Sequence, residues 1–193
     1  MKINQDARAL KQVYPKRRVE GEKVTVAFSC AGDFLIAAFE VYTRELTPDR
    51  APNQTLWNGN VVELFLCISS QGPSVPGQSR WPYYEFEVSP YGQKCLVLVQ
   101  GEGAERRDFT WDLKGFEHEA VLRPERPGWD AVMRIPLRTL GWNGDSLELI
   151  GNAFAILGPS EDARRFFGLN LPEQEVAHFH MPEHFVPLAI ERA

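Results

Sequence analysis

Three of the four histidines in this 193-residue chain lie within seven residues near its C-terminal end. They are His178, His180 and His184, and they alternate with aromatic and apolar residues. On an extended strand, His178 and His180 would project to the same side, about 6.5–7 Å apart, which is close enough to share a metal ion. A single His-x-His pair is a weak signal. The segment therefore leaves two chemistries open: a metal site, or an aromatic surface that binds a ligand.

Carboxylates are the second group that could do chemistry. Glu63 lies on an otherwise apolar segment, and its neighbours on the same face, Val61 and Phe65, are apolar. A carboxylate in that setting needs an arginine, a backbone donor, a cation or a sugar hydroxyl. Glu85 and Glu87 share one face of the next segment, and paired carboxylates about 5–9 Å apart can cleave glycosidic bonds.

The alternation of a half-solvated strand explains Glu85 and Glu87 without catalysis, because it places both toward water. The sequence contains no nucleophile elbow, P-loop or HExxH motif. We therefore predict that the chain is not an enzyme. The alternative is a metal-dependent or glycoside-active enzyme.

Trp57 lies in a polar, turn-rich stretch, Gln54 to Asn60, directly before an apolar strand. A tryptophan in such a loop either caps the edge of a core or offers its face to a ligand. Sugars stack on aromatic faces, and nearby carboxylates and amides hold their hydroxyls. A saccharide is therefore one ligand that the face of Trp57 could bind, and a sugar hydroxyl is one of the partners open to Glu63.

Composition excludes several classes of function. A net charge of −5 gives no basic field for nucleic acid, and no apolar run approaches the ~20 residues that span a bilayer. The first residues show no secretory signal, so we expect a cytoplasmic protein, or a secreted one if a leader has been removed. Cys30, Cys67 and Cys95 are widely spaced in apolar segments, which favours buried free thiols.

The segments that carry these residues have the sequence patterns of β-strands. Apolar residues alternate with period two along 24–30, 62–68, 84–88 and 129–135, and residues 34–42 are apolar on both faces, as in a central strand. Residues 135–141 alone suggest a helical turn. About eight or nine short strands with at most short helical turns predict an all-β protein, an antiparallel sandwich of immunoglobulin or jelly-roll type. No linker divides the chain, so we predict one domain over residues 1–193.

Four motifs in this order resemble family 9 carbohydrate-binding modules. Residues 56–66 read LWNGNVVELFL, 83–92 read YYEFEVSPYG, 128–137 read GWDAVMRIPL and 179–185 read FHMPEHF. Together they extend the similarity over roughly residues 20 to 190. The resemblance implies a non-catalytic β-sandwich related to DOMON domains.

The resemblance also implies a site. In that family two aromatics clamp the end of a glycan, and their positions fall on Trp57 and Phe179. The family's glutamate that hydrogen-bonds to sugar hydroxyls falls on Glu63, and the position after the second aromatic is His180. The family's basic residue on the next strand falls on Glu87, which reverses its charge.

Cofactors enter through the same resemblance. Some members bind structural calcium through loop carboxylates, but Asn60 stands at the acidic position beside Trp57. Haem-binding DOMON relatives use Met and His ligands, for which Met181 and Met133 are the available methionines. We expect no cofactor, with structural calcium as the exception to test.

Our expected ligand is a small saccharide or glycan end, stacked between Trp57 and Phe179 and held by Glu63, Glu87, Asn60 and His180. One alternative is a metal- or haem-binding protein that uses His178, His180 and His184. A further alternative is a protein-interaction domain that has lost sugar binding, with a protein partner in place of a saccharide.

Overall fold

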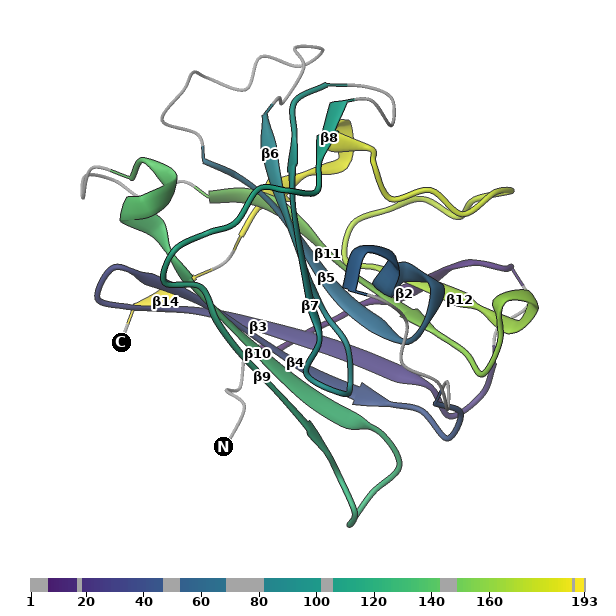
Figure 1. The fold of residues 1–193 in the computed structure, drawn as a ribbon. Helices are drawn as coiled ribbons and strands as arrows, with labels where there is room; N and C mark the ends of the chain where they lie inside the picture. The colour runs from purple at the N-terminus through teal and green to yellow at the C-terminus, as the bar shows by residue number, and fades with distance from the viewer. Residues whose placement is uncertain are drawn as a thin grey trace.

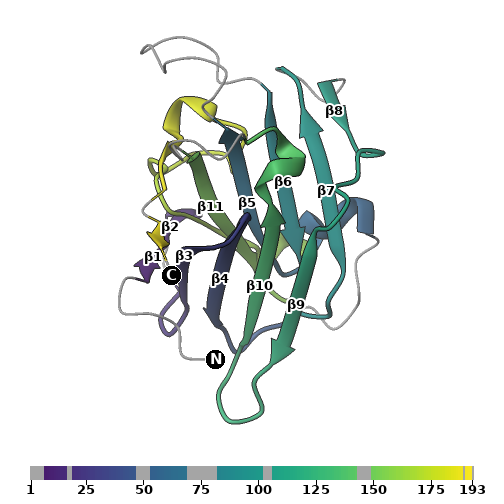
Figure 2. The same ribbon diagram turned by 90° about the vertical axis from the view of Figure 1, so that its left-hand side faces the viewer.

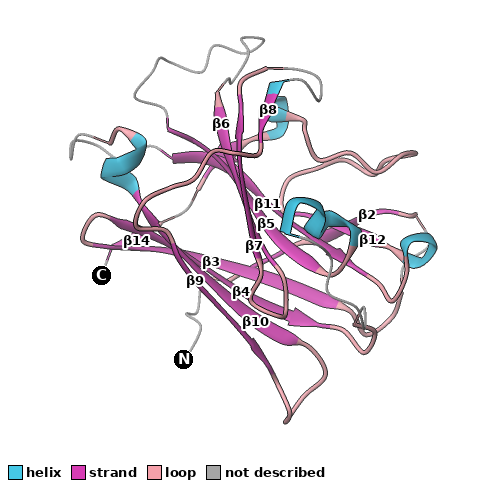
Figure 3. Ribbon diagram, in the orientation of Figure 1, coloured by secondary structure: helices cyan, strands magenta, loops and turns pink. Residues whose placement is uncertain are grey.

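The computed structural model describes residues 7–16, 19–46, 53–68, 82–101, 106–142, 149–188 and 190–192. Nearly all of the regular structure is strand, and the few helices are short 3₁₀ turns (Figure 3). The elements, in chain order, are β1 (Arg8–Ala9), β2 (Lys11–Tyr14), β3 (Lys23–Ala31), β4 (Phe34–Tyr42), η1 (Asn53–Asn58), β5 (Val61–Ile68), β6 (Tyr83–Val88), β7 (Lys94–Val99), β8 (Arg107–Asp108), β9 (Glu117–Leu122), β10 (Trp129–Pro136), η4 (Leu137–Leu140), β11 (Leu149–Leu157), η5 (Glu161–Ala163), β12 (Arg165–Gly168), η6 (Pro182–His184), β13 (Val186–Pro187) and β14 (Glu191–Arg192).

Two sheets pack face to face, as Figure 1 shows and the turned view of Figure 2 confirms. Among the described residues, the first sheet has six strands in the order β1-β3-β4-β10-β9, with β14 also pairing with β3. The second has eight, in the order β2-β12-β11-β5-β6-β7-β8, with β13 also pairing with β11. Every pair is antiparallel except β14 with β3. The predicted all-β antiparallel sandwich is confirmed.

The main core lies between the two sheets and is built by the alternation seen in the sequence. Side chains that face inward on β5 and β10 are fully or almost fully buried, among them Leu64, Leu66 and Met133. β4, apolar on both faces, lies between β3 and β10 as a central strand should. The predicted helical turn is η4, which ends at Gly141 with a φ of 92° that glycine adopts without strain.

The outer face of the second sheet is also covered, which the alternation did not predict. A second apolar cluster lies there, built from Phe65 on β5, Phe154 on β11, and Phe179 and Phe185 from the C-terminal segment. Successive side chains of a strand point to opposite faces. Consequently β5, β6 and β11 bury both of their faces, and any polar side chain on the outer face is enclosed.

Two smaller findings complete the fold. All three cysteines are free thiols, as predicted; Cys95 is buried, and Cys30 and Cys67 are half-buried. Within the described residues, no helix has the length and apolar character needed to cross a membrane.

Candidate functional site

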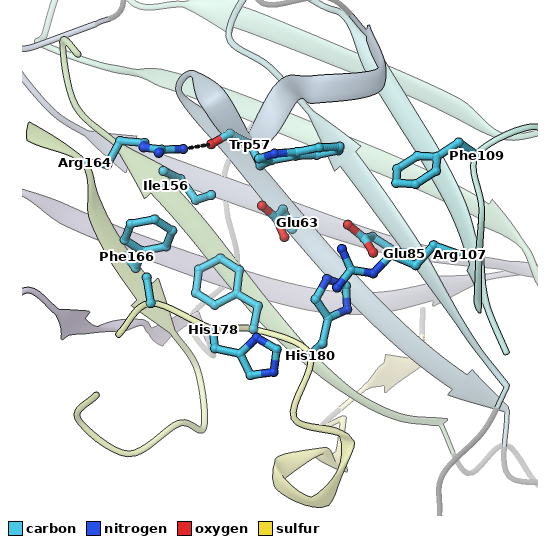
Figure 4. Close-up of a pocket in the computed structure, with 12 residues that line it drawn as sticks. Trp57, Glu63, Glu85, Arg107, Phe109, Ile156, Arg164, Phe166, His178 and His180 are labelled. Carbon is cyan, nitrogen blue, oxygen red and sulfur yellow. Dashed lines mark hydrogen bonds between the residues drawn. The ribbon is translucent and has the colours of Figure 1, made fainter. Parts of the chain in front are cut away.

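A cavity of about 230 Å³ opens on the outer face of the second sheet. Its walls come from segments far apart in the sequence: η1, the central strands β5, β6 and β11, the short strands β8 and β12, and residues 177–180. Figure 4 shows the carboxylates of Glu63 and Glu85 pointing into this space, with Trp57 on one side and His180 and Arg107 on the other. The structure thus brings Trp57, Glu63, Phe179 and His180, four of the predicted site residues, together at one cavity.

Aromatic rings form much of the cavity wall. Trp57 is half-buried and packs against Phe109, with ring centroids 5.8 Å apart at a tilt of 43°. Phe179 stacks on Phe154 at 4.4 Å and meets the edge of Phe166 at 5.5 Å. The Phe179 side chain is only 7% exposed, so it offers a ligand little of its surface. Trp57, Phe109 and Phe166 present the larger accessible aromatic area.

The position of Trp57 is fixed by its backbone. The Arg164 guanidinium donates a hydrogen bond of 2.9 Å to the Trp57 carbonyl (Figure 4). It also donates one of 3.3 Å to Asn58 Oδ1. Thr55, within η1, has non-helical backbone angles (φ −143°, ψ 35°), so the segment is kinked just before the tryptophan. The turn that carries Trp57 is therefore tied to the loop before β12, and the indole ring itself packs against Phe109.

Three carboxylates are enclosed at the base of the cavity. The register of β5 and β6 places Glu63 directly opposite Glu87, and Phe65 opposite Glu85. All three carboxylates lie on the outer face of the sheet, where their side chains meet, with one oxygen of each within 4.8 Å of the others. Glu63 is 2% exposed, Glu85 5% and Glu87 0%. The prediction that Glu85 and Glu87 face solvent is wrong, because the outer face of this sheet is covered.

These carboxyl groups have few partners. Oε1 of Glu63, Oε2 of Glu85 and both oxygens of Glu87 are buried without a hydrogen-bond donor. Burial raises the pKa of Glu63 well above its ordinary value, the Glu85 charge raises it further, and Arg107 lowers it in part. Burial and the charges of Glu63 and Glu85 raise the pKa of Glu87 well above its ordinary value too. Burial also raises the pKa of Glu85, although contact with Glu87 and the Arg107 charge act in the opposite direction.

His180 is held as a neutral ring. Its Nδ1 hydrogen-bonds to the hydroxyl of Tyr83, and the ring lies 5.2 Å from Phe65, centroid to centroid. Burial, followed by the charge of Arg107 and the proximity of the His178 ring, lowers the pKa of His180 to about 3. A neutral imidazole at the cavity wall can exchange hydrogen bonds with hydroxyl groups without carrying a charge.

The three-histidine metal site is not formed. His178 and His180 both line the cavity, with ring centroids 5.9 Å apart, but residues 176–181 are irregular and not an extended strand. His184 lies on η6 and does not line the cavity. Within the described residues, the side chains that gather with the spacing of metal ligands are Glu63, Glu85 and Glu87 instead.

The methionines and Asn60 are used structurally. Met133 is fully buried in the main core, and Met181 Sδ accepts a hydrogen bond from Gln174, so the two are placed in different parts of the fold. Asn60 is 3% exposed and does not line the cavity. Its amide donates to the Gly158 carbonyl and accepts from the Gly158 N–H, both at 3.1 Å. Asn60 therefore joins two loops instead of holding a ligand, and this amide is not a free ligand for calcium.

Several residues at the cavity were not among the predicted site residues. Glu85, Arg107, Phe109 and Phe166 all line it. Glu85 could have been found from its spacing to Glu87, had the outer face been recognised as covered. Arg107 lies on a strand of two residues with no hydrophobic pattern, so no local signal indicated that it lines the cavity.

No protein-family model matches the chain, and no curated protein matches it in sequence. Solved structures do match. A candidate carbohydrate-binding protein from Bacteroides uniformis aligns over 96% of this chain and 86% of its own, with 22% identity and a TM-score of 0.72.

A family 9 carbohydrate-binding module from Caldicellulosiruptor kristjanssonii, solved with cellotriose, aligns over 97% of this chain and 83% of its own, with 15% identity and a TM-score of 0.63. Its structure with glucose aligns over 100% and 88%, with 16% identity and a TM-score of 0.61. The chain therefore has the fold of a family 9 carbohydrate-binding module.

Proposed function

We propose that this chain binds a saccharide, without catalysis, in the cavity between Trp57 and the C-terminal segment. The observation that carries the proposal is the combination of aromatic wall and polar base. Trp57, Phe109 and Phe166 offer apolar ring faces, while the carboxylates of Glu63 and Glu85 point into the same space. A sugar ring has apolar C–H faces and hydroxyls at its edge, so it complements both. Three solved structures with this fold belong to proteins described in terms of carbohydrate.

Polar groups at the cavity provide donors and acceptors for hydroxyls. The Glu63 and Glu85 carboxylates accept hydrogen bonds when ionised, the Arg107 guanidinium donates them, and neutral His180 adds a ring nitrogen. Buried groups of this kind are satisfied when a hydroxyl reaches them and unsatisfied otherwise. Such a site discriminates between sugars by the positions of their hydroxyls.

The size of the cavity favours a single sugar residue. Its volume of about 230 Å³ lies below the ~300–1000 Å³ of sites for drug-sized ligands. We therefore expect a monosaccharide or one end of a glycan. We expect a weak to moderate affinity, with Kd from ~10 µM to the millimolar range, because most of the interaction free energy offsets the ordering of ligand and side chains.

The test is a saccharide screen followed by calorimetric titration of the wild type and Trp57→Ala. We expect a sugar that binds the wild type and loses at least ~10-fold in affinity to the variant, because the largest accessible ring face is removed. Trp111→Phe is the matched control, since Trp111 packs on Tyr84 and Phe86 near the main core and does not line the cavity. Equal affinity in Trp57→Ala would contradict the site assignment. Product release during titration would contradict non-catalytic binding.

A further inference from the structure

The carboxyl cluster of Glu63, Glu85 and Glu87 lacks the partners that three buried acids need. Each is more than nine-tenths buried, and four of their six oxygens have no hydrogen-bond donor. Glu87 is fully buried, no donor from outside the cluster reaches either of its oxygens, and one of them lies within 4.8 Å of an oxygen of each neighbour. Like charges placed directly opposite on neighbouring strands are destabilising, and Glu63 and Glu87 are such a pair. A cation in their midst would satisfy oxygens that the protein leaves open.

We propose that Glu63, Glu85 and Glu87 bind a divalent cation of the calcium class at the base of the cavity, and that this ion coordinates hydroxyls of the bound saccharide. The second half of this proposal rests on the proposed function, whereas the first half does not.

Charge supports a divalent ion. Three ionised carboxylates carry three negative charges, and Arg107 is the basic side chain whose charge acts on Glu63 and Glu85. A divalent cation and Arg107 together match the three carboxylates, which removes the need to bury net charge. Without the ion, a proton shared between Glu85 and Glu87 is the available substitute, and it leaves Glu63 unsatisfied.

Ligand type and ligand number favour calcium over other ions. All ligands are carboxylate oxygens, which suit hard cations and not zinc or copper. Two ligands on opposite sides of a Ca²⁺ ion are about 4.6–5.2 Å apart, since each Ca–O distance is about 2.3–2.6 Å. Oxygens within 4.8 Å of one another are compatible with that span, and Mg²⁺ is usually held by one or two carboxylates together with several waters.

An ion at this cluster would face the cavity and would keep coordination positions open for the saccharide. Glu63 and Glu85 line the cavity, whereas Glu87, opposite Glu63 on the neighbouring strand, does not. An ion held by the three would therefore be reached through the cavity and would face it on one side. Calcium takes six to eight oxygen ligands, so positions remain for water or for vicinal hydroxyls of a sugar. The ion would thereby convert a repulsive acidic cluster into a site for hydroxyl groups.

The experiment is calcium titration of the full chain after EDTA treatment, followed by calorimetry and by thermal unfolding, both without sugar. We expect one ion per chain, and a Tm that rises on the order of 3–6 °C when free calcium is tenfold above its Kd. Glu87→Gln should abolish both effects, because it removes a ligand that does not touch the cavity. Glu119→Gln, an exposed acid on β9, should change neither.

The proposal is overturned if the wild type binds no calcium by calorimetry at millimolar concentrations. It is equally overturned if Glu87→Gln binds the ion as well as the wild type does, since the ion then lies elsewhere.

A sugar titration in EDTA and in calcium separates this proposal from the proposed function. Equal sugar affinity in both conditions would support the proposed saccharide binding and would refute coordination of the saccharide by the ion. If the chain binds calcium but no saccharide in the screen, the ion site would be supported and the proposed saccharide binding refuted.

Discussion

Replacing Glu87 by glutamine should stabilise the metal-free protein at neutral pH. Glu87 is 0% exposed, and its carboxylate lies within 4.8 Å of two others. At that distance and an effective dielectric constant of about 20, each pair of ionised carboxylates repels by about 3.5 kcal/mol. Glutamine keeps the shape of the side chain, removes the charge and supplies an N–H that can donate to its neighbours. The substitution thus replaces a buried carboxylate, which is repelled by its neighbours when ionised, with a neutral amide that can hydrogen-bond to them.

The size of the effect has an upper limit set by protonation. The wild type can always take up a proton at Glu87, and at pH 7, against the ordinary pKa of 4.5, doing so costs about 3.4 kcal/mol. We therefore expect Glu87→Gln to raise the free energy of unfolding by about 1–3.4 kcal/mol at pH 7. The raised pKa means that the folded state binds the proton more tightly than the unfolded chain. Wild-type stability from this group is therefore fully present below about pH 4.5 and is lost as pH rises toward the folded pKa.

The assay is urea unfolding of both proteins in EDTA at pH 7 and at pH 4.5. The gain from glutamine should shrink to roughly 0.4 kcal/mol at pH 4.5, because the wild-type carboxyl is then protonated at little cost. Glu119→Gln should stay within about 0.5 kcal/mol at both pH values, since that side chain is exposed. A loss of more than 1 kcal/mol at pH 7 in Glu87→Gln would refute the reasoning, because it would mean that the carboxylate has a favourable partner in the metal-free protein.

Three further outcomes follow from the fold. Asn60→Ala should lower the free energy of unfolding by about 1–3 kcal/mol in urea but leave calorimetric saccharide affinity unchanged, because its amide bonds to Gly158; a specific loss of affinity would return Asn60 to the site. Arg165→Met should destabilise by about 3–5 kcal/mol, since it removes the cationic partner of the buried Glu22 carboxylate, to which Thr43 Oγ1 still donates. A neutral result would show that the ion pair contributes nothing. Gly128→Ala should lower Tm by several degrees, because its φ is 120° and a Cβ would lie 1.9 Å from a backbone carbonyl of β4; an unchanged Tm would show that the loop relaxes freely.

The sandwich was predictable because each sheet keeps one alternating face on the main core. The pattern along residues 24–30, 62–68 and 129–135 reports burial directly, and β3, β5 and β10 follow it. The rule that alternating polar residues face solvent failed at Glu85 and Glu87. The sequence of one strand does not indicate whether other segments of the chain cover its second face. That information is long-range, and it comes from η1 and from residues 177–185.

The site was partly predictable for a similar reason. Trp57, Glu63 and Phe179 could be placed by motif, since each lies at a fixed offset from a recognisable strand. Arg107 could not, because it comes from a two-residue strand that only the completed sheet defines. The spacing of the three histidines suggested a metal site as an alternative, but spacing along an irregular segment does not fix the direction of the side chains. Within the described residues, the acidic side chains with the spacing of metal ligands lie on β5 and β6.

The cavity wall is assembled from segments that are more than 100 residues apart, with Trp57 at one end of the range and residues 177–180 at the other. A ligand seated there acts on the chain as a reversible crosslink between its N-terminal half and its C-terminal segment. Binding should therefore slow amide hydrogen exchange in β5, β11 and the C-terminal segment together, not only at the residues it touches. Ligand binding in the cavity and local unfolding of the second sheet should therefore be thermodynamically linked.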